Sequence, residues 1–289
     1  MLNDAMKSFI ALTLREDIGD GDVTSESSVP SDLIVKGYIL AKEEGVVAGI
    51  SVALEVFNQV NPSISFNAIA NDGDSVKYGD VIIELEGAAR SILTGERLAL
   101  NFMQRMSGIA TRTNEIVSLL EGTPTKVLDT RKTTPGLRAF EKWAVYLGGG
   151  VNHRMGLYDM ILLKDNHVDY AGGMKEALLQ VASFQTSRVS HLPLVIETRS
   201  YEEIEIALEA SSSTGIKIDR ILLDNFSHAE VAEAVKRYSN KVVLEASGGI
   251  TLENVRGYGD AGVAFVSMGY ITHSVNSLDL SLKSTPHVS

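Results

Sequence analysis

The chain contains no cysteine among its 289 residues. This absence excludes disulfide bonds, thiolate nucleophiles and zinc or iron–sulfur sites built on cysteine. It fits a reducing compartment, and we expect a cytoplasmic protein. Long apolar runs are also missing, since none approaches the ~20 residues that a membrane helix needs. The first residues show neither a basic n-region nor a small-residue cleavage site, so we expect no secretory signal and no membrane partner.

Basic side chains are in the minority, with 26 Lys and Arg against 37 Asp and Glu and a formal net charge of −11. Because nucleic-acid binding needs a basic face, we expect no nucleic-acid partner. The segment from Arg105 to Lys164 is the exception, with nine basic and five acidic side chains. A basic block within an acidic protein predicts a focused anion site, although a solvated helix face is the alternative.

The length allows two domains with buried cores. Residues 36–86 look β-rich, because short apolar runs alternate with Asp-Gly and Tyr-Gly-Asp turns. The acidic segment EDIGDGDVTSE lacks the ligand spacing of a calcium loop and predicts a turn with Asx-type hydrogen bonds. Residues 91–120 show helical periodicity, with an expected break near Ser107-Gly108.

The remainder of the chain alternates short apolar runs with amphipathic helical segments. The runs are residues 126–128, 160–163, 194–196, 221–223, 242–244 and 264–266. Such βα alternation predicts parallel strands that are buried on both faces. No GxGxxG turn opens the first unit, so the pattern does not support a dinucleotide-binding fold.

Each apolar run ends in polar or small residues, and in a β/α barrel the carboxyl ends of the strands meet on the face that carries the chemistry. The early ends and the loop between them are cationic, which suits carboxylates and phosphates: Arg131, Lys132, His153, Arg154 and Lys164.

The middle strand ends carry Glu197 and Asp224, which predict contact with a developing positive centre or with a hydrated Mg²⁺ ion. The last strand ends are small and leave backbone N–H groups accessible to a phosphate: Ser247, Gly248, Gly249 and Gly269.

The segment TRKTTPGLRAFEKWAVYLGGGVNHRMGLYDMILLKDNH, which starts at Thr130, resembles the quinolinate phosphoribosyltransferases, the decarboxylating nicotinate-nucleotide pyrophosphorylases. The segments EDIGDGDVTSE, LTGERLALNFMQRMSGIAT, IETRS, ILLDNF, EASGGIT and SMGYITHS resemble the same family. Together they extend the resemblance over nearly the whole chain.

The resemblance implies an enzyme, a nicotinate-nucleotide diphosphorylase (carboxylating) of the glycosyltransferase class. It would join quinolinate to phosphoribosyl pyrophosphate, release pyrophosphate and CO₂, and give nicotinate mononucleotide for NAD biosynthesis. The implied fold is an open seven-stranded β/α barrel with an N-terminal α/β sandwich domain, and a short strand near Val151-Asn152 is the candidate for the seventh strand. We expect residues 1–110 to form the sandwich, joined by residues 273–289, and residues 111–272 to form the barrel.

The family pattern also assigns roles to individual residues. Four side chains would bind the quinolinate carboxylates: Arg131, His153, Arg154 and Lys164. Lys132 would lie close to the reacting groups. Glu197 and Asp224 would hold the ribose hydroxyls and Mg²⁺, as catalytic residues and metal ligands. Four residues would bind phosphate: Ser247, Gly248, Gly249 and Gly269.

The resemblance further implies a homodimer or a higher homo-oligomer, in which the small domain of one subunit faces the barrel mouth of its partner. Arg105 would reach into the partner's site.

The sequence departs from the family at Tyr146 and Leu147, and again at Met268 and Tyr270, which flank Gly269. The second departure bears on the shape of the phosphate loop.

Two other classes of function remain open from the residues alone. Lys132 or Lys164 could act as the Schiff-base amine of a barrel aldolase, which requires a lysine with a depressed pKa. A silent phosphosugar-binding protein is the other class, although Glu197, Asp224 and Lys132 are all present. A molybdenum-transport-associated homologue of the same family is a further alternative.

Overall fold

The computed structural model describes residues 2–286. The chain divides into two compact units. The first unit contains residues 1–115, 133–149 and 271–289, and the second contains residues 116–132 and 150–270. No helix in the described range is long and apolar enough to cross a membrane.

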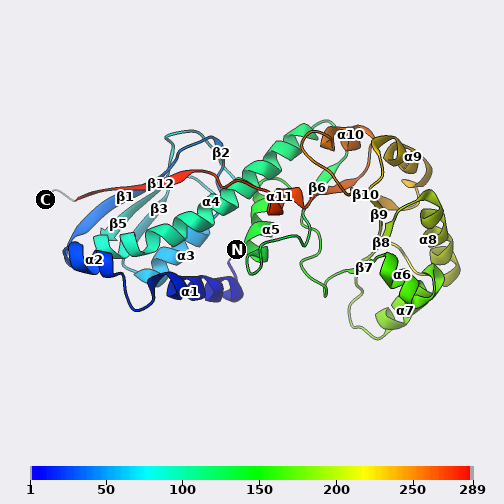
Figure 1. The fold of residues 1–289 in the computed structure, drawn as a ribbon, viewed down its shortest axis with the longest axis horizontal. Helices are drawn as coiled ribbons and strands as arrows, with labels where there is room; N and C mark the ends of the chain where they lie inside the picture. The colour runs from blue at the N-terminus through cyan, green and yellow to red at the C-terminus, as the bar shows by residue number, and fades with distance from the viewer. Residues whose placement is uncertain (1, 287–289) are drawn as a thin grey trace. The chain divides into compact units, whose positions relative to one another are not determined.

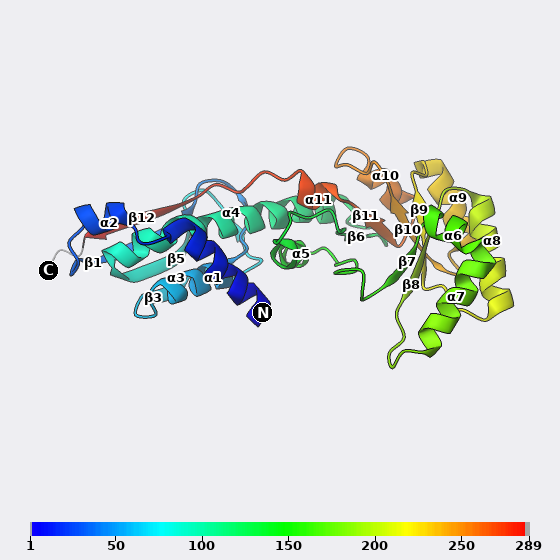
Figure 2. The same ribbon diagram turned by 60° about the horizontal axis from the view of Figure 1, so that its bottom comes forward.

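The first unit contains an antiparallel sheet in the order β12-β1-β5-β3. Its strands are β1 (Ile34–Ala41), β3 (Ser65–Ala68), β5 (Val81–Ala88) and β12 (Leu280–Pro286). A small ladder pairs β2 (Gly45–Val46) with β4 (Ser75–Val76). The pairing of β12 with β1 brings the end of the chain back to the first unit, and both ribbon views show these strands side by side (Figures 1 and 2).

The helices of the first unit are α1 (Asp4–Ile18), α2 (Val23–Ser28), α3 (Ile50–Val60), most of α4 (Ala89–Leu119), α5 (Arg138–Leu147) and most of α11 (Tyr270–His273). The prediction of a β-rich segment at residues 36–86 missed α3. This helix buries Ile50, Ala53 and Phe57, and the Asp72 carboxylate accepts a hydrogen bond from the backbone N–H of Ile50 at its first turn.

Residues 133–149 were assigned by the sequence to the barrel domain, but they pack within the first unit. The Phe140 ring on α5 lies 5.8 Å from the Phe9 ring and 4.9 Å from the Phe102 ring, measured between centroids. These aromatic contacts join a segment from the middle of the chain to helices α1 and α4.

Helix α4 runs without a break through Ser107 and Gly108, so the predicted interruption is wrong. The Ser107 hydroxyl donates a hydrogen bond to the carbonyl of Ala48 and accepts one from its backbone N–H. A Cβ on Gly108 would lie 2.1 Å from the carbonyl oxygen of Asn276. Both residues therefore permit close backbone packing against the helix rather than ending it.

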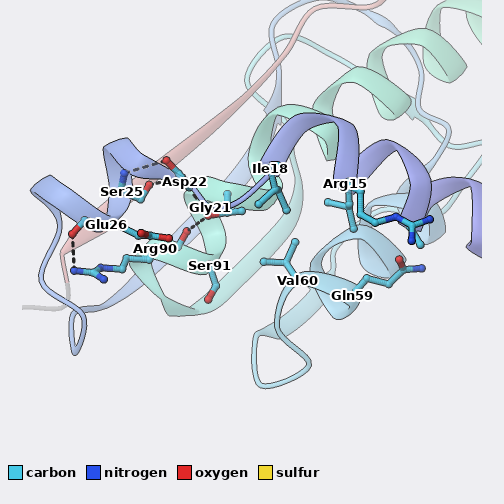
Figure 3. Close-up of a pocket in the computed structure, with 14 residues that line it drawn as sticks. Arg15, Ile18, Gly21, Asp22, Ser25, Glu26, Gln59, Val60, Arg90 and Ser91 are labelled. Atoms are coloured by element: carbon cyan, nitrogen blue, oxygen red, sulfur yellow. Dashed lines mark hydrogen bonds between the residues drawn. The ribbon is translucent and has the colours of Figure 1, made fainter.

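A cavity of about 690 Å³ lies in the first unit among α1, α2, α3 and the start of α4 (Figure 3). Its Asp22 carboxylate caps α2 by accepting from the backbone N–H of Ser25, which confirms the predicted Asx-type turn. Hydrogen bonds from Ser25 lower the pKa of Asp22. Arg90 donates to the carbonyls of Glu26 and Val29. The cavity contains none of the predicted site residues.

The second unit contains a parallel sheet in the order β6-β11-β10-β9-β8-β7. Its strands are β6 (Lys126–Leu128), β7 (Ile161–Leu163), β8 (Leu194–Thr198), β9 (Arg220–Asp224), β10 (Val243–Ser247) and β11 (Phe265–Ser267). Each of the six predicted runs contributes one strand. Val151 forms a parallel bridge with Leu128 and so provides the predicted seventh strand in its shortest form.

Helices α6 (Asp165–Ala171), α7 (Met174–Thr186), α8 (Tyr201–Thr214), α9 (His228–Tyr238) and α10 (Val255–Asp260) connect the strands of the second unit. In the described part of the chain no pairing joins β7 to Val151, which are the two ends of the strand series. The result is the open β/α barrel that the sequence predicts.

The replacement Gly108→Ala tests the role of Gly108 in close packing. Alanine normally stabilises a helix relative to glycine by about 1 kcal/mol. Here the new methyl group would collide with a backbone carbonyl, and we expect a net loss of about 1–3 kcal/mol in the free energy of unfolding. Asn114→Ala, at an exposed position of the same helix, is the matched control and should unfold at or above the wild-type temperature. Equal melting temperatures for the two variants would contradict the packing argument.

Candidate active site

The strand register aligns the carboxyl ends of the second unit along one edge of its sheet. Asp224 is opposite Ser247, Ser247 is opposite Ser267, and Ser267 is opposite Leu128. At the other end of the series, Leu163 is opposite Ile196. The polar residues that end or follow these strands are therefore gathered at one face, as β/α-barrel geometry requires.

Arg131 follows β6, and Arg154 follows the Val151 bridge. Burial lowers the pKa of Arg154, the positive charge of Arg131 lowers it further, and Asp159 acts in the opposite direction. Two guanidinium groups that repel each other are stabilised when an anion lies between them. Lys132 is exposed beside Arg131, and its backbone N–H donates to the Thr130 hydroxyl.

The loop that carries His153 and Arg154 is anchored by the buried carboxylate of Asp129. This carboxylate accepts from the His153 backbone N–H at 2.8 Å and from the Asn152 side-chain amide at 2.6 Å. The Arg154 guanidinium donates to the carbonyl of Met160 at 3.2 Å. The sequence prediction did not include Asp129 as a site residue, although its place directly after a buried strand was the available signal.

Glu197 on β8 forms an ion pair with Lys164, with 2.6 Å between Oε2 and Nζ. Asp224 ends β9 and accepts a hydrogen bond from the side-chain amide of Asn225 at 2.8 Å. Asn225 has a positive φ of 59°, and its backbone N–H donates to the carbonyl of Ser247 at 2.8 Å. This strained residue links the acidic strand end to the glycine turn that follows β10.

The described residues contain no group of three or more His, Cys, Asp or Glu side chains that could hold a metal ion. Glu197 and Asp224 instead lie on adjacent strands as two carboxylates. Mg²⁺ is commonly held by one or two carboxylates together with substrate phosphates and water. The donor set therefore fits a magnesium ion that arrives with a phosphorylated substrate, rather than a cage made by protein alone.

The turn after β10 depends on two glycines with positive φ angles, 97° at Gly248 and 59° at Gly249. A Cβ on Gly248 would lie 2.2 Å from the Asn225 side-chain oxygen, whereas a Cβ on Gly249 would meet nothing within 4 Å. The turn is thus packed tightly on one side and open on the other. Met268 is buried, so its bulk lies in the core rather than at the open side of this turn.

Arg105 is the one predicted site residue that lies in the first unit. Its guanidinium contacts the buried Glu141 carboxylate at 2.8 Å and the Thr272 carbonyl at 2.6 Å. All the other predicted site residues belong to the second unit.

The structure also identifies a buried carboxylate that the sequence prediction left out. Glu245 on β10 is fully buried and accepts from Arg220 at 2.7 Å. Its second oxygen lies 3.6 Å from Nε2 of His153. Glu245 begins the EASGGIT segment, but an acidic residue next to a buried apolar run gave no indication of which side chain it contacts.

Gly248→Ala should destabilise the second unit, because it adds both left-handed strain and a collision with Asn225. Gly215→Ala is the matched control, since Gly215 has a φ of 73° with nothing within 4 Å of its Cβ position. We expect about 1 kcal/mol of destabilisation for the control and a clearly larger loss for Gly248→Ala, measured by denaturant unfolding. A loss no greater than that of the control would mean that the turn adapts to a side chain.

Two family profiles cover most of the chain. "Quinolinate phosphoribosyl transferase, N-terminal domain" matches residues 22–107, and "Quinolinate phosphoribosyl transferase, C-terminal domain" matches residues 109–283. The chain is 44% identical over 288 residues to quinolinate phosphoribosyltransferase [decarboxylating] 1b of Nicotiana tabacum, with 96% of this chain and 82% of the relative covered.

A bacterial relative gives a similar result. The probable nicotinate-nucleotide pyrophosphorylase [carboxylating] of Bacillus subtilis is 41% identical over 280 residues, which cover 97% of this chain and 93% of the relative. The crystal structure of NadC from Streptococcus pyogenes superposes with a TM-score of 0.92 at 36% identity, over 99% of this chain and 98% of that one. On these matches and on its fold, the chain belongs to the quinolinate phosphoribosyl transferase family.

Proposed function

We propose that the carboxyl edge of the parallel sheet in the second unit is the active site at which quinolinate and phosphoribosyl pyrophosphate combine. The products are nicotinate mononucleotide, pyrophosphate and CO₂, in the biosynthesis of NAD. The observation that carries the proposal is the strand register, because it aligns the cationic, acidic and glycine-bearing strand ends on one edge.

The cationic residues hold the pyridine dicarboxylate. Arg131 and Arg154 repel each other in the free site, so binding of a carboxylate between them relieves an unfavourable interaction. Guanidinium groups bind carboxylates in a fixed, bidentate geometry, and this fixes the plane of the ring. The pyridine nitrogen is thereby directed at C1 of the ribose, which is a positioning effect.

The acidic strand ends act on the phosphoribosyl group. As the bond from C1 to the pyrophosphate oxygen breaks, the ribose acquires oxocarbenium character. Glu197 and Asp224 stabilise this positive charge and hold the ribose hydroxyls. The same two carboxylates would hold Mg²⁺, which supplies charge neutralisation for the leaving pyrophosphate when it is bound. The turn at Gly248 and Gly249 accepts the 5′-phosphate on its open side.

Decarboxylation follows from the chemistry of the product ring. The nitrogen lone pair forms the new bond to C1, so the pyridine ring becomes a cation. The bond from the ring to the 2-carboxylate then breaks, its electron pair stays on C2, where the adjacent positive nitrogen stabilises it, and CO₂ leaves. A proton from solvent or from a neighbouring acid completes the ring carbon.

The Schiff-base alternative has little support at Lys164. Its Nζ lies 2.6 Å from the Glu197 carboxylate, so the atom that would have to attack a carbonyl carbon is already engaged in an ion pair. The alternative of a silent phosphosugar-binding protein does not explain why both carboxylates and the cations are retained together at one edge.

A homodimer or larger homo-oligomer, with Arg105 completing the partner's site, is part of the proposal. The support is that Glu141 and the Thr272 carbonyl hold the Arg105 guanidinium in place, while the Arg105 side chain remains 26% exposed. Such a preorganised cation suits recognition of an anion presented by another subunit. The cytoplasmic location stays a prediction, since three relatives from Nicotiana are named mitochondrial.

Arg154→Ala should lower kcat/KM for quinolinate by about 10- to 100-fold, because a charge-assisted contact to a carboxylate is lost. Arg188→Ala removes an exposed arginine of the same unit that stacks on Phe184, and it should leave the kinetics unchanged. Steady-state assays of pyrophosphate release give both values. Wild-type kinetics in Arg154→Ala would show that this residue does not bind the substrate.

The reaction itself is tested by incubating the protein with Mg²⁺, phosphoribosyl pyrophosphate and either quinolinate or nicotinate. CO₂ and a mononucleotide should form with quinolinate alone. Product from nicotinate, or no CO₂ from quinolinate, would contradict the proposed reaction. Removal of Mg²⁺ with a chelator should abolish turnover, and addition of the ion should restore it.

Subunit mixing tests the shared site. Arg105→Ala and Arg154→Ala subunits should each keep no more than about a tenth of the wild-type activity alone. If Arg105 acts in the partner's site, mixed dimers contain one intact site, and random reassembly recovers about a quarter of the wild-type activity. A mixture that remains as inactive as its components, with subunit exchange shown by native mass spectrometry, would place Arg105 in its own subunit's site.

A further inference from the structure

The Glu245 carboxylate is buried at the centre of the second unit and only half of it is paired. Its Oε2 accepts from the Arg220 guanidinium at 2.7 Å. Its Oε1 is buried and has no hydrogen-bond partner among the described residues. A buried carboxylate oxygen without a donor is costly, so its orientation calls for an explanation.

Arg220 does not by itself explain the second oxygen. Its guanidinium lies over the Phe265 ring at 4.3 Å from the centroid and contacts Oε2, and its side chain is 18% exposed. If Glu245 only neutralised Arg220, a bidentate contact with both oxygens would be the stronger arrangement. Instead, Oε1 is directed at the imidazole of His153.

The His153 ring is held in one orientation, and its hydrogen bond assigns its proton. Its Nδ1 accepts from the backbone N–H of Arg154 at 2.7 Å, so the proton of the neutral ring lies on Nε2. Nε2 lies 3.6 Å from Oε1 of Glu245, and the two side chains are 7% and 0% exposed. A donor and an acceptor thus face each other at slightly more than hydrogen-bond distance.

We propose that Glu245 is a positioning residue: its buried carboxylate holds His153 in the Nε2–H form, and His153 in turn holds the Arg154 backbone at the carboxylate-binding end of the site. Asp129 fixes the same loop through the backbone N–H of His153, whereas Glu245 acts on the ring. The inference deepens the proposed function, on which it rests for the identity of the substrate.

The variant Glu245→Gln tests this directly. The amide oxygen can still accept from Arg220, but the amide NH₂ then faces Nε2–H, and two donors oppose each other. His153 can relieve this only by moving its proton to Nδ1, where it would oppose the Arg154 N–H, or by leaving its position. Glu205→Gln is the matched control, because this exposed glutamate of the same unit accepts a hydrogen bond from the Tyr238 hydroxyl.

The first readout needs no substrate. The chain has six histidines, and ¹⁵N spectra of histidine-labelled protein, with His153→Gln for assignment, report the tautomer of each ring. We expect an Nε2–H pattern for His153 in the wild type and in Glu205→Gln, and a changed or broadened pattern in Glu245→Gln. An unchanged His153 signal in Glu245→Gln, or an Nδ1–H pattern in the wild type, would overturn the proposal whatever the enzyme's substrate.

The second readout is kinetic. Glu245→Gln should raise KM for quinolinate about tenfold and leave KM for phosphoribosyl pyrophosphate within about twofold. In a His153→Gln background the same replacement should have no further effect on quinolinate KM. An equal rise in both KM values, or an effect that persists without His153, would show that Glu245 supports the fold generally.

A second variant covers the case in which Glu245→Gln does not fold. Glu245→Asp keeps the negative charge but shortens the side chain by one methylene group, which moves the carboxylate away from the His153 ring. We expect a selective rise in quinolinate KM in this variant too. A wild-type quinolinate KM in Glu245→Asp would overturn the proposal. Absence of any quinolinate turnover in the wild type would contradict the proposed function, and the ¹⁵N experiment would still decide the Glu245–His153 contact.

Discussion

The parallel register of six short strands is the constraint on which the rest of the site depends. Strands of only three to five residues cannot be displaced along one another without moving their polar ends out of line. Hydrogen bonds between neighbouring strands and apolar burial on both faces fix that register. The chemistry of the edge is therefore a consequence of backbone pairing, and side-chain contacts refine it afterwards.

Three buried carboxylates fix the cations and the loop that carry positive charge. Glu141 holds the guanidinium of Arg105, Asp129 holds the loop before Arg154, and Glu245 holds Arg220. In each case the acid is fully buried, while the cation or the loop it fixes is more exposed. A protein that must present positive charge to an anionic substrate benefits from this arrangement, because the supporting negative charges are kept away from the ligand.

The sequence predicted the parts of this molecule whose signal is local. Alternation of apolar runs with helices is sufficient to identify the six strands, and the residue after each run is necessarily at the carboxyl edge. The Asx turn at Asp22 is local in the same sense. These features follow from the periodicity and turn chemistry of a few neighbouring residues.

Features that depend on distant partners were missed. The serine and glycine of α4 look like a helix break until Ala48 and Asn276 are placed beside them. Residues 133–149 follow a barrel strand in sequence, but their aromatic contacts lie with α1 and α4. Glu245 looks like part of a motif, and only the coordinates show that it contacts Arg220 and faces His153. Long-range pairing, which no short window contains, decides all three.

The pairing of β1 with β12 has a consequence for how the protein is made. Val35 is opposite Pro286, so the central strand of the first unit's sheet acquires one of its two neighbours from the far end of the chain. On a ribosome, residues 116–132 and 150–270 are complete before that neighbour emerges. The barrel can therefore begin to fold during synthesis, while β1 keeps one unpaired edge until β12 has emerged, and an unpaired strand edge is a site of aggregation.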